Sequence, residues 1–419
     1  GSSARTNEKI LVLDKVMALT LESRTYSDSG VPVFQDTDVT VLNKAELNFD
    51  GLRPQRDTLW YGKTTFQVQD EKYTIDEFLN FGAEGQTYLI TQTSTGMKFA
   101  AKFCINQDAM EVKLLKKLPR SLVMHPNFLT YEMIVLDVNA HFAPAHHIII
   151  MEHVPNGELF SLLASQEPAV AGKPLSEGSS RRFLQDIVNG VAECYRYGIT
   201  HRDLKPENLL INEHGSIIII DLGHAKRGEA QPQNQTLAAV PLARTSTVNQ
   251  YGSVAFNAPE VTKGLKYDCE LADVWSVGVI AFLLHAKLPP FDKGGGVANF
   301  QDCRGTENES FWTKINSCGY YAPFPESLVR FINALWRYDP SSRPTFSQLR
   351  SAVCGDEAII SEFPGLAWLA QPLNDSKEFI SELRAYCPEK VFRCEAENNS
   401  ETQLEQQGLD KEGRAPKRW

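Results

Sequence analysis

Two aspartates in polar segments on either side of a buried-looking apolar run are the residues of this chain best suited to chemistry. Asp203 stands in the segment His201-Arg202-Asp203-Leu204-Lys205-Pro206-Glu207-Asn208, and Asp221-Leu222-Gly223 follows four consecutive isoleucines, Ile217 to Ile220. Carboxylate and amide oxygens of this kind are the ligands that hard cations such as Mg²⁺ prefer. The plainer alternative is a histidine and two aspartates in solvated loops.

The two segments together carry a family resemblance. The first matches the protein-kinase catalytic loop at every defining position, and the second matches the metal-binding motif at the family's spacing. The sequence therefore resembles the eukaryotic protein-kinase family. Lys205, two residues after Asp203, is the arrangement of its Ser/Thr branch.

The resemblance implies a role for each polar residue of these segments. Asp203 is expected to orient the substrate hydroxyl or accept its proton, and Lys205 to neutralise the transferring phosphate. Asn208 and Asp221 are expected to hold Mg²⁺. Phosphoryl transfer depends on positioning and charge neutralisation more than on covalent help, and these residue types supply both.

An upstream lysine resembles the residue that contacts the α and β phosphates of the nucleotide in this family. It is Lys102, at the end of Phe99-Ala100-Ala101-Lys102, and its expected partner is Glu111 on an amphipathic helix predicted over residues 111–118. The connector before Glu111 is shorter than is usual in the family, so we expect it to restrict the helix or to fray its first turn. The alternative is an ordinary exposed glutamate on a lysine-rich helix.

The segment from Leu79 to Tyr88 resembles the family's Gly-rich loop in part. Gly82 and Gly85 take the second and third glycine places, where backbone amides must approach phosphate without a Cβ in the way. Asn80 replaces the first glycine and Thr87 replaces a valine. Glu84 adds a negative charge close to the expected triphosphate.

The remaining nucleotide contacts follow from the same resemblance. Met151-Glu152-His153-Val154 is similar to the hinge, with Met151 as gatekeeper and the backbone from Glu152 to Val154 offering hydrogen bonds to adenine. Leu210 stands where the family places an apolar residue under the base. These nucleotide-binding residues are Gly82, Gly85, Lys102, Glu152, Val154 and Leu210.

Downstream residues resemble the substrate-positioning segment and its supports. Ser253 stands where the family keeps a hydroxyl that bonds the catalytic aspartate, and Glu260 is expected to form a buried ion pair with Arg343. Asp273-Val274-Trp275-Ser276 resembles the helix that braces the catalytic loop. Arg202 is of the kind that clamps a phosphate on the activation segment, for which Thr245, Ser246 and Thr247 are candidates.

The pattern of elements predicts a small strand-rich unit followed by a larger helical one, and the resemblance implies an α+β, bilobal protein-kinase fold. A small antiparallel-sheet N-lobe with one control helix precedes a larger, mainly helical C-lobe, in which Phe183, Ile187, Val191 and Cys194 recur at helical spacing. The expected organisation is a partly strand-bearing extension (1–73), the N-lobe and hinge (74–154), the C-lobe (155–352), a helical extension (353–394) and a disordered tail (395–419).

Composition narrows the classes of partner. The net charge of -10 removes the uniform positive field that non-specific nucleic-acid binding uses, and no apolar run is long enough to span a membrane. The eight cysteines are too few for a disulfide scaffold, and most are expected to be core residues or idle thiols. Pairing of Cys303 with Cys318 and of Cys387 with Cys394 remains an alternative.

The sequence as a whole predicts an ATP- and Mg²⁺-dependent Ser/Thr protein kinase, with Mn²⁺ as another usable metal and a protein as substrate. Two alternatives stay open: a pseudokinase scaffold that acts through protein interactions, and a core whose extensions dock partners. The strand-bearing start and the divergent Gly-rich loop also resemble secreted effector kinases of intracellular parasites. The expected location is therefore an ATP-rich intracellular compartment, or a host cell for a secreted effector.

Overall fold

The computed structural model describes residues 40–43, 48–50, 64–82, 84–136, 145–167, 170, 172–228, 246–247, 253–264, 266–291, 303, 308–319 and 321–394. The chain divides into two compact units. The first comprises Gly1–His125, Thr130–Glu152 and Arg227–Ala243, and the second comprises Pro126–Leu129, His153–Lys226 and Arg244–Trp419. The tail predicted over 395–419 lies outside the described residues.

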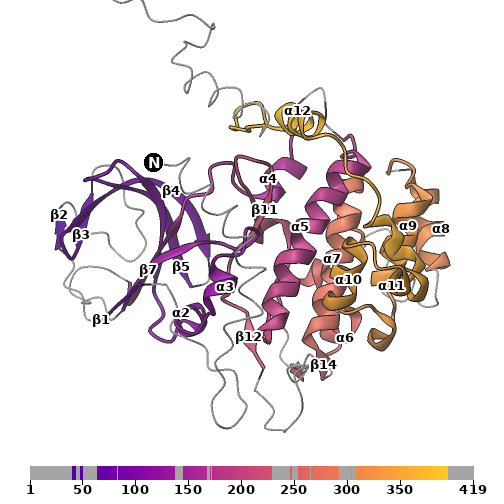
Figure 1. The fold of residues 1–419 in the computed structure, drawn as a ribbon, viewed down its shortest axis with the longest axis horizontal. Coiled ribbons are helices and arrows are strands. Elements are labelled where there is room, and N and C mark those ends of the chain that lie inside the picture. Colours follow the sequence, from indigo (N-terminus) through magenta and orange to yellow (C-terminus); the bar gives the residue numbers. More distant parts are fainter. Residues whose placement is uncertain are drawn as a thin grey trace, which may run out of the picture. The chain divides into compact units, whose positions relative to one another are not determined.

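The first unit is built on one eight-stranded sheet, drawn in indigo and violet in Figure 1. The spatial order is β1-β7-β8-β6-β5-β4-β3-β2, and every neighbouring pair is antiparallel except β1 and β7, which run parallel. The strands are β1 (Thr40–Asn43), β2 (Asn48–Asp50), β3 (Thr65–Val68), β4 (Glu71–Gly82), β5 (Gly85–Gln92), β6 (Lys98–Cys104), β7 (Tyr131–Leu136) and β8 (His147–Glu152).

Side chains that point to one face of the sheet, every second residue along a strand, form its apolar core. In β3 the residues Phe66 and Val68 are buried while their neighbours are half-buried, as the period of two in a strand requires. Phe66 stacks on Tyr73 with ring centroids 5.4 Å apart, and Tyr88 meets Phe103 edge to face at 5.7 Å. These aromatic pairs link β3, β4, β5 and β6 into one apolar layer.

The sheet is larger than the sequence predicted. Strands from the expected N-terminal extension, β1, β2 and β3, belong to it, so the sheet begins well before residue 74. Among the residues of this unit that the structure describes, the helices are short: α2 (Met110–Leu115) and α3 (Arg120–Val123). The helix predicted to reach Leu118 ends three residues earlier, because Pro119 disfavours helical dihedrals at Leu118, which is nevertheless fully buried.

The second unit is mainly helical. Its α-helices are α4 (Leu159–Leu163), α5 (Glu177–Arg196), α6 (Pro259–Thr262), α7 (Cys269–Ala286), α8 (Glu309–Cys318), α9 (Glu326–Leu335), α10 (Phe346–Val353), α11 (Glu357–Glu362) and α12 (Ser376–Tyr386). Short strands are β9 (Ile199–Thr200), β10 (Leu209–Ile211), β11 (Ile217–Ile219), β12 (Lys226–Arg227), β13 (Ser246–Thr247) and β14 (Tyr267–Asp268). The 3₁₀ turns are η1 (Pro206–Asn208), η2 (Val254–Phe256), η4 (Pro340–Ser342) and η5 (Pro364–Trp368).

Helices α5 and α7 form the centre of this unit. The predicted apolar stripe of α5 is confirmed, since Phe183, Ile187, Val191 and Cys194 are all buried. The side chain of Ser176 caps the helix by accepting a hydrogen bond from the N–H of residue 179. Helix α7 is apolar around most of its circumference, and 89% of it is buried in the unit, which identifies it as a core helix although its length and hydropathy would suit a membrane span.

The C-terminal extension is helical, as predicted, and packs on the second unit. Arg181 of α5 donates to the carbonyls of Trp368 and Pro372 at 2.7 and 2.6 Å, and its guanidinium lies 4.8 Å from the centre of the Trp368 ring. Glu382 of α12 accepts hydrogen bonds from both the N–H and the hydroxyl of Ser176 at 2.7 Å. The segment that includes η5 and α12 (yellow in Figure 1) is therefore part of this unit.

None of the eight cysteines forms a disulfide, so the alternative pairings of Cys303 with Cys318 and of Cys387 with Cys394 are wrong. Six of the eight are buried, as expected for small core residues, while Cys318 is half-buried and Cys354 is exposed. Burial raises the pKa of the Cys194 thiol well above its usual range and makes it inert.

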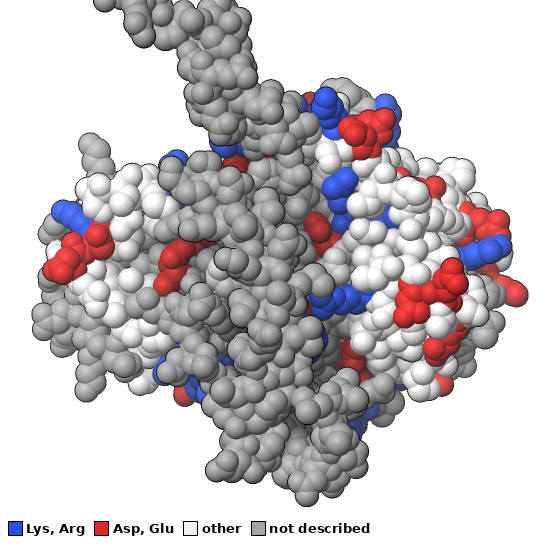
Figure 2. Space-filling model, in the orientation of Figure 1, with Lys and Arg blue, Asp and Glu red and all other residues white. Residues whose placement is uncertain are grey.

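Charged side chains of both signs are visible among the described residues on one face of the molecule. On the face shown in Figure 2, acidic and basic side chains of the described residues alternate, and neither sign covers a large area. The net charge of the chain is -10. Among the described residues on this face, no broad basic surface of the kind that binds nucleic acid through its phosphates is present.

Candidate active site

In the first unit the predicted ion pair between Lys102 and Glu111 is present. Lys102 Nζ lies 2.5 Å from Glu111 Oε2, and only 3% of the Glu111 side chain is exposed. The alternative reading of Glu111 as an ordinary exposed residue is therefore wrong. Glu111 stands in the first turn of α2, so the short connector from β6 still brings the carboxylate to the lysine.

The turn between β4 and β5 has the form of a tight hairpin. Gly82 pairs with Gly85, and Gly85 in turn pairs with Cys104 of β6. A Cβ at Gly85 would lie 2.0 Å from the carbonyl oxygen of Phe103, so this position accepts only glycine. A Cβ at Gly82 would lie 4.0 Å from the nearest atom, so the fold does not require glycine at this position.

The boundary between the two units falls within the predicted hinge: Glu152 belongs to the first unit and His153 to the second. The N–H of Glu152 donates to the carbonyl of Thr130 at 2.9 Å, and its side chain accepts from the N–H of Thr130 at 2.8 Å. Glu152 can therefore offer adenine its carbonyl but not its N–H. Val154 is buried, and Leu210 is half-buried on β10.

In the second unit, Asp203 is the centre of a hydrogen-bonded cluster. Lys205 Nζ lies 2.8 Å from its Oδ2, and the N–H of Ser253 donates to its Oδ1 at 3.0 Å. Asn208 Nδ2 donates to the carbonyl of Asp203 at 2.8 Å and to its Oδ2 at 3.1 Å. Lys205 also donates to the hydroxyl of Ser253 at 3.1 Å. Ser253 therefore contacts Asp203 through its backbone N–H, and its hydroxyl, which the sequence placed on the aspartate, accepts from Lys205 instead.

Asp203 is held in its ionised form. Burial opposes ionisation, but hydrogen bonds from His224 and Lys205 outweigh it and hold the pKa of Asp203 well below its usual range. His224 Nδ1 lies 3.5 Å from Asp203 Oδ2, and the hydrogen bond to Asp203 raises the pKa of His224 in spite of its partial burial. Sequence reasoning missed His224, although its position directly after Asp221-Leu222-Gly223 was a usable signal.

The oxygen donors of Asn208 and Asp221 suit a hard cation. The amide nitrogen of Asn208 is used by Asp203, which leaves its Oδ1 as the atom for a metal. Asp221 has a positive φ of 63°, and its Oδ1 accepts from the N–H of Gly223 at 3.0 Å. Within the described ranges no group of three or more His, Cys, Asp or Glu side chains is placed to hold a metal. A site with so few protein ligands fits a cation such as Mg²⁺ that takes its other ligands from water and phosphate.

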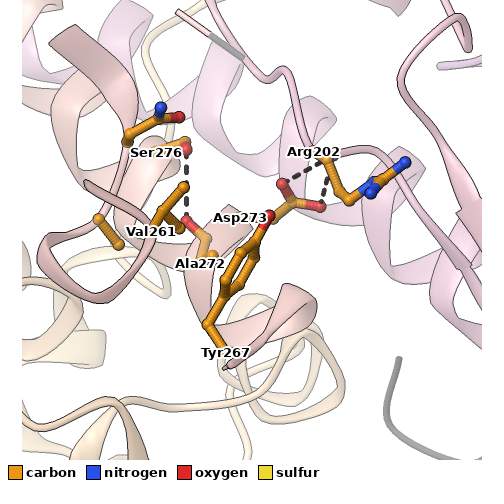
Figure 3. A pocket seen from close by; sticks show the side chains of 8 residues that line it. Arg202, Val261, Tyr267, Ala272, Asp273 and Ser276 are labelled. Atoms are coloured by element: carbon orange, nitrogen blue, oxygen red, sulfur yellow. Dashed lines mark hydrogen bonds between the residues drawn. The ribbon is translucent and has the colours of Figure 1, made fainter. Parts of the chain in front are cut away.

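Asp273 of α7 fixes the backbone of the catalytic loop, as Figure 3 shows for Arg202. Its carboxylate accepts from the N–H groups of His201 at 3.0 Å and Arg202 at 2.9 Å, and from the hydroxyl of Tyr195 at 2.7 Å. These bonds hold Arg202 at a φ of 65°, a left-handed conformation that is rare for a side chain of this size. Burial raises the pKa of Asp273 to about 6. The bracing role predicted for this helix is confirmed.

The pocket drawn in Figure 3 lies behind this brace, and Tyr267, Ala272 and Ser276 are among its lining residues. Nearby, Arg343 and Glu260 form the predicted buried pair through two bonds, Nη1 to Oε1 at 2.6 Å and Nη2 to Oε2 at 3.0 Å. Of the predicted phosphorylation candidates, Thr245 lies outside the described residues. Ser246 and Thr247 form β13, which pairs with β14.

Comparison with known families identifies the same span that carries these motifs. The family model described as "Protein kinase domain" matches residues 73–353, well over half of the 419-residue chain. The match includes the residues described above in each unit, from the β4–β5 turn to Arg343.

Individual relatives agree with the family match. CBL-interacting protein kinase 28 of Oryza sativa subsp. japonica is 29% identical over 288 residues, which cover 67% of this chain and 58% of that protein. CBL-interacting serine/threonine-protein kinase 24 of Arabidopsis thaliana is 30% identical over 280 residues, covering 65% and 54% respectively. The chain thus spans about half the length of the curated relatives it matches.

Proposed function

We propose, since the chain belongs to the protein kinase family, that it is a serine/threonine protein kinase that transfers the γ-phosphoryl group of ATP to hydroxyls of a protein substrate. The observation that carries the proposal is the environment of Asp203. Its ionised carboxylate pairs with Lys205 Nζ at 2.8 Å. It also accepts hydrogen bonds from Asn208 Nδ2 at 3.1 Å and from the N–H of Ser253 at 3.0 Å.

This arrangement suits transfer to a hydroxyl. Because Asp203 is ionised, it accepts a hydrogen bond from the attacking hydroxyl and directs the oxygen lone pair towards the phosphorus. Lys205 places a positive charge beside the same carboxylate, where negative charge from the transferring group develops. Asp273 keeps the loop rigid through bonds to its backbone, so the carboxylate needs little reorganisation during transfer.

Asn208 and Asp221 would hold the divalent metal through Oδ1 of the amide and the carboxylate. The metal supplies charge neutralisation on the phosphates when bound. We propose Mg²⁺ as this metal, with Mn²⁺ as a substitute, because both accept oxygen ligands in an incomplete protein shell. In the first unit, Lys102 would bind the α and β phosphates, and Glu111 would orient its ammonium through the 2.5 Å contact.

Phosphate transfer from γ-labelled ATP to a generic basic protein tests the proposal. The wild type should label the acceptor when Mg²⁺ is present, and chelation of the metal should abolish the label. Asp203→Asn and Asp221→Asn should each lower transfer by about 10² to 10⁴-fold. Asp70→Asn, an exposed turn residue, is the matched control and should leave the rate unchanged.

Nucleotide binding separates the proposal from the pseudokinase alternative. A ligand that binds only the folded protein raises its melting temperature, so a thermal shift with ATP and Mg²⁺ reports binding. Binding without transfer to any acceptor, or to the protein itself, would favour the scaffold and contradict the proposal.

A further inference from the structure

Glu84 places a second carboxylate beside Lys102. Its Oε2 lies 3.6 Å from Lys102 Nζ, while Oε2 of Glu111 lies 2.5 Å from the same nitrogen. The three side chains are sheltered, with exposed fractions of 19% for Glu84, 13% for Lys102 and 3% for Glu111. Two carboxylates therefore share one ammonium group, and the cluster carries a net negative charge.

The backbone holds Glu84 in this position. The carbonyl of Glu84 accepts a hydrogen bond from the N–H of Ile105 at 2.9 Å, just beyond the end of β6. The next residue, Gly85, lies against the backbone of Phe103 so closely that no side chain fits between them. These two backbone contacts hold the turn against β6, the strand that carries Lys102. The Glu84 side chain therefore lies beside the lysine.

The carboxylate of Glu84 is poorly satisfied where it lies. Its Oε2 is buried and accepts no hydrogen bond from the described residues, so its compensation is the long contact with Lys102. Glu111 holds the same lysine at a much shorter distance. A buried carboxylate oxygen without a hydrogen bond is unfavourable, so Glu84 is the partner that is more easily displaced.

We propose that Glu84 is a specificity residue of the nucleotide site, whose carboxylate takes the place of a nucleotide phosphate at Lys102. The inference rests on the proposed function, which assigns Lys102 to the phosphates of a nucleoside polyphosphate. A phosphate that approaches Lys102 must displace this carboxylate and meets its repulsion. The penalty therefore grows with the number of phosphates, and a nucleoside without phosphate escapes it.

Calorimetric binding of adenosine, ADP and ATP in the presence of Mg²⁺ tests the inference on the full chain. Glu84→Gln keeps the size of the side chain and removes its charge. ATP should bind this variant about tenfold more tightly than it binds the wild type, ADP should gain less, and adenosine should stay within about twofold. Glu77→Gln, on the exposed part of β4, removes an equal charge from the same hairpin and should change none of the three affinities.

Three results would overturn the inference while leaving the proposed function intact. In the first, Glu84→Gln binds ATP as tightly as the wild type does. In the second, it binds ATP more weakly, and in the third its affinities for adenosine and ATP rise by the same factor. A weaker affinity would show that Glu84 helps to hold the metal. Absence of nucleotide binding by the wild type and by every variant would instead contradict the proposed function, and this inference with it. Glu84→Ser removes the carboxylate with a smaller side chain and should give the same order of gains, should Glu84→Gln fail to fold.

Discussion

Replacement of Phe379 by alanine tests whether the C-terminal extension is part of the folded second unit. Phe379 is 1% exposed on α12, and its ring meets Phe183 of α5 edge to face with centroids 5.5 Å apart. The guanidinium of Arg182 lies 4.8 Å from the ring centre. A Cβ at Gly215 would lie 2.6 Å from Cε1 of the same ring, so the β10–β11 turn closes tightly over it.

These contacts give the expected size of the effect. Removal of a fully buried phenylalanine ring costs about 3 to 5 kcal/mol, through lost transfer free energy and the cavity that remains. The edge-to-face pair, worth about 1 kcal/mol, and the cation–π contact place Phe379→Ala in the upper half of that range. We therefore expect the free energy of unfolding of the second unit to fall by about 4 kcal/mol.

Urea unfolding of the full chain, followed by tryptophan fluorescence, measures this change. Ser381→Ala, an exposed position on the same helix, is the control and should stay within about 0.5 kcal/mol of the wild type. A loss below about 1 kcal/mol in Phe379→Ala would refute the reasoning. It would mean that α12 does not contribute to the stability of the unit.

Three further outcomes are expected. Glu260→Gln should lower the free energy of unfolding by about 3 to 5 kcal/mol in the same urea assay, because it leaves the Arg343 guanidinium, whose exposure is 0%, without its anionic partner. His224→Gln should cost most stability at acid pH, measured by urea unfolding at a series of pH values. Its partner Asp203 raises the pKa of His224 in the folded state, so the stabilisation is full below about pH 6.5 and is lost as the pH rises through the raised value. Cys354, the exposed thiol, should be alkylated first by iodoacetamide in the native protein, as peptide mapping would show.

Each of these expectations has a result that would contradict it. A loss of less than about 1 kcal/mol in Glu260→Gln would mean that the bidentate contact with Arg343 is not held in solution. A stability difference for His224→Gln that is constant with pH, or that grows towards alkaline pH, would exclude the contact with Asp203. Alkylation of Cys194 at the same rate as Cys354 in the native state would exclude the burial of α5.

The catalytic half of the site was predictable because its residues are close together in the chain. Asp203, Lys205 and Asn208 fall within six consecutive residues, and the resemblance of that segment to a kinase catalytic loop implied a role for each of them. The same applies to the stripe on α5, whose helical period is a local property of the sequence.

Contacts between distant segments were harder to predict. The parallel pairing of β1 with β7 joins residues about ninety positions apart, and no local pattern encodes that register. The closeness of Glu84 to Lys102 depends on how the β4–β5 turn lies on β6, and the contact of His224 with Asp203 depends on the path of the chain after β11. The sequence showed these charges but not the distances between them.

The contact of Glu382 with Ser176 is another that the sequence did not predict. Glu382 accepts hydrogen bonds from Ser176 at the start of α5, more than two hundred residues earlier in the chain. No local pattern in the sequence links these two residues, because their contact depends on how α12 packs against the start of α5. The extension was therefore recognised as helical, while its place in the second unit came from the structure.

The most direct test of the central claim is mass spectrometry of an acceptor protein after incubation with this chain, ATP and Mg²⁺. The account predicts phosphate on serine or threonine residues of the acceptor with the wild type, and at most trace amounts with Asp203→Asn of equal thermal stability. Equal phosphorylation by wild type and Asp203→Asn, or none by the wild type when ATP is shown to bind, would contradict it.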